Sequence, residues 1–494
     1  MIVFLSGCAP MVVTRTGNDA SLIPAQWSVQ APNGANTALI PVSTNMSPYG
    51  GGLLKWWQRF NDPILSSLVE QSMKSNLTII GAQASLRQAR ALRDQAEAGL
   101  LPLVSSSASA QHNTLGRHTS TNTYSAGFDA SWELDVFGGN RQALNASEAV
   151  VAASIANLGD IQISITAEVA IDYIVLRSTQ ARLLIARENL KSQETTQQLT
   201  QWRLQAGLVT ELEVDQAIAA VEQTRAQLPV LQTSLDQTRH AISVLSGQAP
   251  AALSVLLNTT VIVPQAGNDL ILDVPAETLR QRPDVRAAEY QISAAMSRVA
   301  QADAARFPNF RIGGSLGLNA ARLSALGDSS SIISSLLAGV TLPIFNGGAL
   351  RAQVRIEQAL FDQSTATYRA TVLAALAGVE DVLVALRDDR DRLISLRRAA
   401  DAAANAAGLA RQRFSSGLID FQVVMDTQRT QLLTQDAVAI AYANISTDQV
   451  RLYKALGGGW SSALSGLPGL SSAKEAAEND QQMPIDVNLP LHHL

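Results

Sequence analysis

The chain of 494 residues has few of the side chains that catalyse reactions or bind metals. Its five histidines are His112, His118, His240, His492 and His493. None has a glutamate at the spacing of a metal site, and a histidine pair in a polar tail, such as 492–493, is more commonly solvated than metal-bound. The segment GGSLG at 313–317 lacks the lysine of a phosphate-binding loop and lies in an alternating, strand-like pattern. We therefore expect no catalytic residues, no cofactor, no metal site and no enzymatic activity.

The only cysteine, Cys8, ends the sequence Leu-Ser-Gly-Cys after a short apolar stretch at the N-terminus. A lone cysteine is most often a small buried apolar residue, but this position is typical of the end of a secretory signal. Leu-Ser-Gly-Cys resembles a bacterial lipobox, in which the cysteine becomes the lipidated first residue of the mature protein. We therefore predict that residues 1–8 are the remnant of a signal peptide with its lipobox, and that Cys8 carries a lipid such as palmitate.

Composition narrows the class of protein and its partners. Hydrophobic residues make up 47% of the chain but aromatic residues only 5%, which favours long helices that pack through small side chains. The net charge is −5 and the basic residues are scattered, so nucleic acid is not an expected partner. No run of eighteen apolar residues is present, so we expect no transmembrane helix. If the chain crosses a membrane, it must do so as strands of a closed barrel.

Residues 124–136 alternate strictly between apolar and polar side chains, which predicts a strand with one apolar face. With three less regular segments, this pattern predicts strands at about 103–113, 122–137, 309–320 and 332–345, joined in pairs by polar loops around 112–123 and 320–331. Tyrosine and tryptophan are enriched at membrane interfaces. The aromatic residues that we expect to anchor these strands in a membrane are Tyr124, Phe128, Trp132, Phe137 and Phe345.

Four strands are too few to close a membrane barrel, because the smallest barrels have about eight. An open sheet in lipid would leave unpaired backbone groups at both edges, each costing several kcal/mol. If these strands enter a membrane, several chains must share one barrel. The strand count therefore predicts an oligomer but not the number of its chains.

Apolar residues at heptad spacing follow each pair of strands and predict coiled-coil helices at about 140–205 and 349–415. A helix of this length reaches roughly 100 Å. Both helices end before a glycine, Gly207 or Gly417, which is the usual residue after the end of a helix. Returning helices are expected at about 210–246 and 420–457, and Thr210 and Asp420 can cap them through their side-chain oxygens.

The two halves of the chain are a duplication. Residues 282–308 align with 76–102 without a gap, Pro308 falls on Pro102 and Phe345 falls on Phe137, while the offset grows only from 206 to 211 residues. A repeat of this length is a domain-sized unit and not a solenoid period. The expected layout is an extended N-terminal segment 9–52, a first repeat 53–248, a linker 249–278, a second repeat 279–460 and a disordered tail 461–494.

Five segments, in this order and at these spacings, resemble the TolC-like outer membrane factor family, specifically its OprM/NodT-type lipoprotein branch, which serves multidrug efflux. They are WELDVFG at 132–138, RPDVRAAE at 282–289, VTLPIFN at 340–346, RFSSGLIDFQVVMDTQR at 413–429 and ALGGGW at 455–460. The resemblance covers roughly residues 53–460. It implies a mainly α fold with membrane β: a homotrimer whose twelve strands form one outer membrane barrel, continuous with an α-helical periplasmic tunnel. The linker 249–278 and the C-terminal segment would form an equatorial belt.

The same resemblance implies that the two hairpin tips meet a periplasmic adaptor, or membrane fusion protein. The tip residues are Arg203, Gly207, Leu208, Thr210, Arg413, Gly417, Leu418 and Asp420. Alternatively, the two glycines only end helices, and both roles are compatible. A gate is expected near the tips, with Asp401 and Arg411 as its candidate residues.

The predicted function is a passive exit duct in the outer membrane of a Gram-negative bacterium, lipid-anchored and extending into the periplasm. It would conduct small molecules such as drugs from an inner membrane pump of the RND type through the adaptor to the exterior. The alternatives are a duct for metal ions or for type I secreted proteins, or a periplasmic coiled-coil scaffold whose strands never meet lipid.

Overall fold

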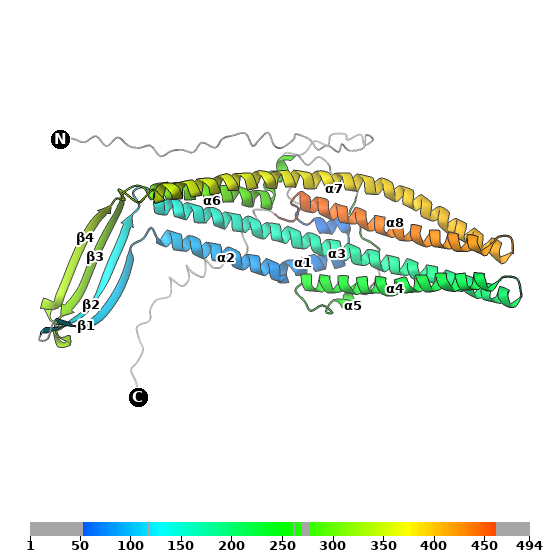
Figure 1. The fold of residues 1–494 in the computed structure, drawn as a ribbon, viewed down its shortest axis with the longest axis horizontal. Helices are drawn as coiled ribbons and strands as arrows, with labels where there is room; N and C mark the ends of the chain where they lie inside the picture. Colours follow the sequence, from blue (N-terminus) through cyan, green and yellow to red (C-terminus); the bar gives the residue numbers. More distant parts are fainter. Residues whose placement is uncertain (1–52, 116–118, 260–261, 268–275, 461–494) are drawn as a thin grey trace, which may run out of the picture.

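The computed structural model describes residues 53–115, 119–259, 262–267 and 276–460. Cys8, the segment 9–52 and the tail with His492 and His493 lie outside the described residues. The described chain is a long rod with a sheet at one end and two helical hairpin tips at the other (Figure 1). The strands therefore form one end of the rod and the long helices form the rest of it, as the resemblance implied.

In the first repeat, the elements are η2 (Trp56–Phe60), α1 (Pro63–Ser75), α2 (Leu77–Ala98), β1 (Leu103–Leu115), β2 (Thr119–Leu134), α3 (Gly139–Gln205) and α4 (Glu211–Leu245). Two short helices follow, α5 (Ser254–Leu257) and η3 (Ala276–Gln281). The second repeat has α6 (Pro283–Ala304), β3 (Asn309–Ala320), η4 (Leu323–Ala325), η5 (Ser329–Ser331), β4 (Ile332–Thr341), α7 (Ala349–Ser415) and α8 (Phe421–Ala455).

The sheet is antiparallel throughout and its strands follow the chain order β1-β2-β3-β4. Its register keeps one face apolar, because Phe128 lies opposite Leu316 and Trp132 lies opposite Ile312. On the other face Asp129 lies opposite Ser315, as the strict alternation predicted. β1 and β4 are edge strands of this sheet.

Two strand ends were predicted too far along the chain. β2 ends at Leu134 because the Asp135 carboxylate accepts hydrogen bonds from the backbone N–H groups of Asn140 and Arg141, at 3.0 and 2.8 Å, and turns the chain into α3. β4 ends at Thr341, shortly before Pro343, which has no backbone N–H to donate. Phe137 and Phe345 therefore lie beyond the strands in which they were predicted to be anchors.

The first strand pair is also longer at its turn than expected, because β1 reaches Leu115 and β2 begins at Thr119 within the predicted loop 112–123. Of the other predicted anchors, Tyr124, Phe128 and Trp132 all lie in β2. The Trp132 indole donates a hydrogen bond to the Leu100 carbonyl at 3.0 Å, which ties the strand to the end of α2.

The heptad positions predicted in the two long helices form the hydrophobic seam of the rod. In α3 the buried members are Leu158, Ile165, Val169, Leu176, Leu183 and Leu190. In α7 they are Val372, Val379, Leu383, Leu386 and Leu393. α3 is also, by length and composition, the one described helix apolar enough to cross a membrane. Its packing against α1, α2, α4, α6 and α8 accounts for that apolar composition, because α3 is the central helix of the rod.

The described part of the linker lies across α3 and α8 and is held by buried side chains. Gln449 bonds both backbone groups of Ala266, each at 3.1 Å, and the Ser446 hydroxyl donates to the Pro264 carbonyl at 2.8 Å. On the other side, Gln180 donates to the Leu257 carbonyl at 2.9 Å. These bonds fix the linker at mid-height of the rod, between the sheet and the tips.

Candidate functional site

The tip of the first hairpin is a glycine turn that satisfies the free carbonyls at the end of α3. Leu208 N–H donates to the Arg203 carbonyl at 2.8 Å, and Gly207 N–H donates to the Leu204 carbonyl at 2.9 Å. This pair of bonds is the Schellman motif, which requires a left-handed residue, and Gly207 has φ +70°. A Cβ atom built on Gly207 would meet nothing within 4 Å, so the tip is open around this glycine.

The second tip repeats the same turn. Leu418 N–H donates to the Arg413 carbonyl at 3.0 Å, Gly417 N–H donates to the Phe414 carbonyl at 2.9 Å, and Gly417 has φ +74°. Space around Gly417 is open in the same way. Both tips therefore have the same backbone geometry, although their glycines are 210 residues apart in the sequence.

Each turn presents an exposed leucine just after its glycine. Leu208 is 71% exposed and Leu418 is 72% exposed. Trp202, one turn before Gly207, is also exposed and was not among the predicted site residues. Large apolar side chains exposed together commonly mark a protein contact surface.

A small hydrophobic core holds the two tips together. Phe414 and Phe421 pack at 5.6 Å between ring centroids, and Ala217, Ala410 and Val424 complete the cluster. The guanidinium of Arg203 lies 4.2 Å from the centre of the Phe414 ring. It also donates a hydrogen bond to the Ser415 carbonyl at 3.0 Å, so Arg203, predicted as a docking residue, joins the first hairpin to the second.

The two returning helices begin differently. Thr210 and Glu213 form a capping box at the start of α4, where Thr210 N–H donates to the Glu213 carboxylate at 2.9 Å. The hydrogen bond with the Thr210 side chain lowers the pKa of the Glu213 carboxyl. Asp420 precedes α8, but its side chain makes no cap hydrogen bond, so the predicted capping role was wrong. The position three residues later is Val423, which cannot complete a capping box.

Arg411, a predicted gate residue, binds across the hairpins. Its guanidinium donates to the Ser192 hydroxyl at 2.8 Å. Next to this contact, the Gln428 amide donates to the Thr196 hydroxyl at 2.9 Å, in a buried position. Asp401, the other predicted gate residue, is exposed and lies about 15 Å from Arg411 along α7, so the structure does not bring the two together.

Further polar links continue along α3 and α8, away from the tips. Arg182 binds the Asp436 carboxylate with two nitrogens, at 2.6 and 3.1 Å. Asn189 donates to the Gln435 side chain at 2.8 Å. The sequence did not reveal these links, because heptad patterns identify the buried face of a helix but not the helix opposite.

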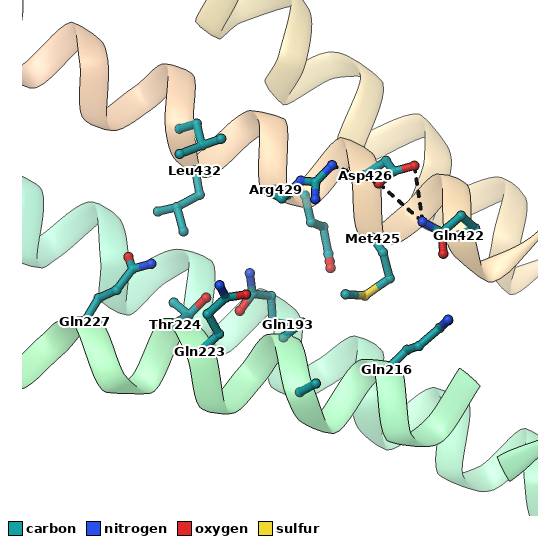
Figure 2. Close-up of a pocket in the computed structure, with 14 residues that line it drawn as sticks. Gln193, Gln216, Gln223, Thr224, Gln227, Gln422, Met425, Asp426, Arg429 and Leu432 are labelled. Carbon is teal, nitrogen blue, oxygen red and sulfur yellow. Dashed lines mark hydrogen bonds and ion pairs between the residues drawn. The ribbon is translucent and has the colours of Figure 1, made fainter. Parts of the chain in front are cut away.

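A groove of about 390 Å³ lies between α4 and α8 near these links (Figure 2). Glutamines line much of it, and Asp426 and Arg429 of α8 lie on its other side. Two of its buried amide oxygens, Oε1 of Gln193 and Oε1 of Gln428, accept no hydrogen bond in the described structure. In the described ranges, no group of three or more histidine, cysteine, aspartate or glutamate side chains could hold a metal ion.

This arrangement of a four-stranded sheet and two long hairpins is found in known proteins. The family model described as "Outer membrane efflux protein" matches residues 68–248 and 274–458, which are the two repeats. The chain belongs to the outer membrane efflux protein family. It has the TolC-like fold, and it is an outer membrane efflux channel of tripartite pump systems, with a periplasmic extension and without enzymatic activity.

Individual relatives support this assignment. The chain is 33% identical to the pyoverdine export outer membrane protein OpmQ of Pseudomonas aeruginosa, over 84% of this chain and 89% of that protein. It is 29% identical to the toluene efflux pump outer membrane protein TtgF of Pseudomonas putida, over 93% and 95%. The solved structure of the outer-membrane channel OprN superposes with a TM-score of 0.78 at 37% identity, over 82% of this chain and 93% of that chain.

Proposed function

We propose that three copies of this chain form the exit duct of a small-molecule efflux system, and that the two hairpin tips dock on a periplasmic adaptor. TolC-like channels function as trimers within tripartite efflux systems. An inner membrane pump of the RND type drives the substrate, and this chain supplies only the passage. Cys8 carries the lipid that holds the N-terminus in the outer membrane.

One observation carries the docking proposal. Two tips that are distant in the sequence share the same turn, the same open space at Gly207 and Gly417, and the same exposed leucine. A glycine turn without a side chain permits close approach of another backbone. The helix hairpin of an adaptor, with small or apolar residues at its own tip, would bury Leu208 and Leu418.

Small organic molecules are the cargo that the relatives favour, since the two matched exporters are named for pyoverdine and for toluene. These two molecules differ in size and polarity, so relatives of this chain serve cargoes of different chemistry. Export of metal ions or of secreted proteins remains the alternative. Deleting the gene and measuring accumulation of a dye, a metal and a secreted protein would separate the three cargo classes.

We assign the closed state to the contacts between the hairpins near the tips. The Arg411–Ser192 and Gln428–Thr196 bonds join α7 and α8 to α3, and both must lengthen if the second hairpin moves away from the first. Asp401 stays a predicted gate residue. Its exposed carboxylate lies nearer the sheet on α7 than these bonds do.

Replacing the glycine of each turn by a bulky residue tests the docking proposal. Gly207→Trp and Gly417→Trp should abolish export and adaptor crosslinking while trimer levels stay normal, because both positions lie far from the sheet. Gly207→Asn and Gly417→Asn are the matched controls, since asparagine tolerates the left-handed backbone and adds a much smaller side chain than tryptophan. If both tryptophan variants export normally, the glycines only end helices, and docking should be sought on the hairpin flanks around Arg411 and Glu213.

A further inference from the structure

The hydrophobic seam between α7 and α8 is interrupted by two aspartates that meet across it. The buried apolar residues on either side of them are Leu386 and Leu393 of α7, and Ile445 and Leu452 of α8. Asp389 and Asp448 occupy the positions between, where the heptad spacing of a coiled coil calls for an apolar residue. A carboxylate in such a seam lowers stability unless it is paired, so the surroundings of each carboxyl decide what the pair does.

Asp448 is almost fully buried, at 3% exposed, and only one of its two oxygens has a partner. The Oδ1 atom accepts a hydrogen bond from Arg451, one turn further along α8, at 3.2 Å. The Oδ2 atom is buried and accepts no hydrogen bond from any described residue. Leaving a buried polar atom unpaired is costly. A proton on the pair removes this cost, because a protonated carboxyl donates a hydrogen bond.

The group that Asp448 meets on α7 is the carboxyl of Asp389. The two carboxyls are close enough for a hydrogen bond between them. Two ionised carboxylates can only accept hydrogen bonds, so this bond exists only when one of the two holds a proton. Arg392 lies 3.7 Å from Asp389, but the side chains of Arg392 and Arg451 are both more than half exposed. Their charges are therefore largely solvated and compensate the buried side of the pair only weakly.

Among the described residues, no other charged group contributes to the pKa of Asp448. The linker stretch 262–267, which packs on another side of α8, has no charged residue. On α3, the pKa of Asp172 responds to Glu168 and not to Asp448, so these carboxyls form a separate pair. Arg280 of η3, an element that contacts α7, is exposed. The two aspartates and their two arginines are therefore the charged groups to be considered.

These surroundings set the direction in which Asp448 titrates. Burial raises the pKa of its carboxyl above the ordinary 3.8, the charge of Arg451 lowers this pKa in part, and the charge of Asp389 raises it again. The net change is upward, so folding favours the protonated form. The stability that the proton contributes is complete below the ordinary 3.8 and is lost as the pH rises through the raised value.

We propose that Asp389 and Asp448 share one proton across the α7–α8 seam, and that this proton clasp tightens the second hairpin in acid and loosens it at neutral pH. α7 and α8 lie side by side over this length (Figure 1). Asp448 lies about 40 Å along α8 from Phe421, where the helix begins. The clasp therefore changes the stiffness of the hairpin that ends at Gly417 without contacting its tip.

The first hairpin has no counterpart of the clasp. Along α7 the offset between the repeats is 208 to 210 residues, which places Asp389 on residues 179–181. Along α8 it is 210 to 211 residues, which places Asp448 on residues 237–238. These positions carry threonine, glutamine and alanine, so they bind no proton near neutral pH. A change of pH acts through this device on the second hairpin alone.

Infrared spectroscopy of the purified full-length protein detects the shared proton directly. The difference spectrum between the wild type and Asp448→Asn should contain the carbonyl stretch of one protonated carboxyl at pH 4.5 and lose it by pH 8. Asp388→Asn is the matched control, because Asp388 is the neighbouring residue of α7, is exposed, and has its pKa lowered by the hydrogen bond with Arg387. This variant should keep the band. A difference spectrum without the band at every pH would refute the clasp.

Hydrogen exchange measures what the proton does to the seam. After correction for the intrinsic pH dependence of exchange, the wild-type amides of α7 and α8 around the pair should exchange about fivefold faster at pH 8 than at pH 4.5, the usual effect of one unpaired buried polar group. Asp448→Asn should stay slow at both pH values, because its amide donates to Asp389 without a proton. Equal corrected rates at both pH values in the wild type would overturn the mechanical role.

Asp389→Asn tests whether the proton is shared. The charge of Asp389 raises the pKa of Asp448, so its removal should move the infrared midpoint to lower pH. An unchanged midpoint would show that Asp448 binds its proton alone, which contradicts sharing. The proposal concerns the second hairpin alone and requires neither an adaptor nor a particular cargo, so these outcomes leave the proposed function untouched.

Discussion

Replacing Thr196 by valine removes one hydrogen bond between the two hairpins and one hydrogen bond within α3. Thr196 is buried, and valine has nearly the same shape. Its hydroxyl accepts from the Gln428 amide at 2.9 Å and donates to the Ser192 carbonyl of its own helix at 3.1 Å. The substitution leaves the Gln428 amide with only the more distant Ser192 hydroxyl, at 3.5 Å.

A buried donor that loses its partner costs about 1–3 kcal/mol. The remaining contact with Ser192 favours the lower end, so we expect the closed state to lose about 1 kcal/mol per copy, or about fivefold in the opening equilibrium. If three copies open together, the loss is about 3 kcal/mol and the opening equilibrium rises about 150-fold. The size of the effect therefore also reports whether opening is concerted.

Thr200→Val is the matched control. Thr200 is buried one turn further along α3, and its hydroxyl bonds the Thr196 carbonyl of the same helix at 2.9 Å. Both variants lose a bond within α3, so the difference between them isolates the bond to Gln428. Open probability of purified trimers in planar bilayers is the measurement. Equal open probabilities for the two variants would refute the assignment of the closed state to this contact.

Two further predictions follow from single residues. Cys8→Ser should abolish incorporation of labelled palmitate while trimers still form, because one acyl chain adds only marginal membrane affinity; loss of all assembly would contradict this. Burial, and next the charge of Glu168, raise the pKa of Asp172 to about 6 from an ordinary 3.8. The protonated form is therefore favoured in the folded state, and its stabilising effect disappears as pH rises through 6. Asp172→Asn should raise trimer stability by about 1–2 kcal/mol at pH 7.5, after allowance for solvent screening, and less at pH 5. An equal thermal shift at both pH values would exclude this role.

Periodicity predicted the elements well because it is a local property. Strict alternation around Phe128 and heptads around Leu176 each follow from neighbouring residues, and the structure has a strand and a helix there. Strand ends were less well predicted, since β2 ends where the Asp135 side chain bonds the start of α3. The period of the sequence carries no sign of such a bond.

Contacts between the hairpins could not be predicted from the sequence. Arg182 and Asp436 are more than 250 residues apart, and nothing in either helix identifies its partner. Arg203 illustrates the same difficulty, because its position beside a turn does not indicate that it binds the Ser415 carbonyl and lies over the Phe414 ring of the other hairpin. The failed cap at Asp420 could not be predicted either, because Asp62 and Asn76 do cap their helices and residue type does not distinguish these three positions.

The two hairpins share one layout but are restrained differently, and this difference indicates which of them moves. α3 is fixed on both sides by α6, α8 and its own repeat, and α4 begins at the Thr210–Glu213 capping box. α7 packs extensively only within its own repeat, and α8 begins without a side-chain cap. Near the tips, the second hairpin is therefore restrained by its bonds to α3, at Ser192, Thr196 and Arg203. Opening should move α7 and α8 while α3 and α4 stay in place, and these three bonds contribute to its free-energy cost together with the hydrophobic core around Phe414.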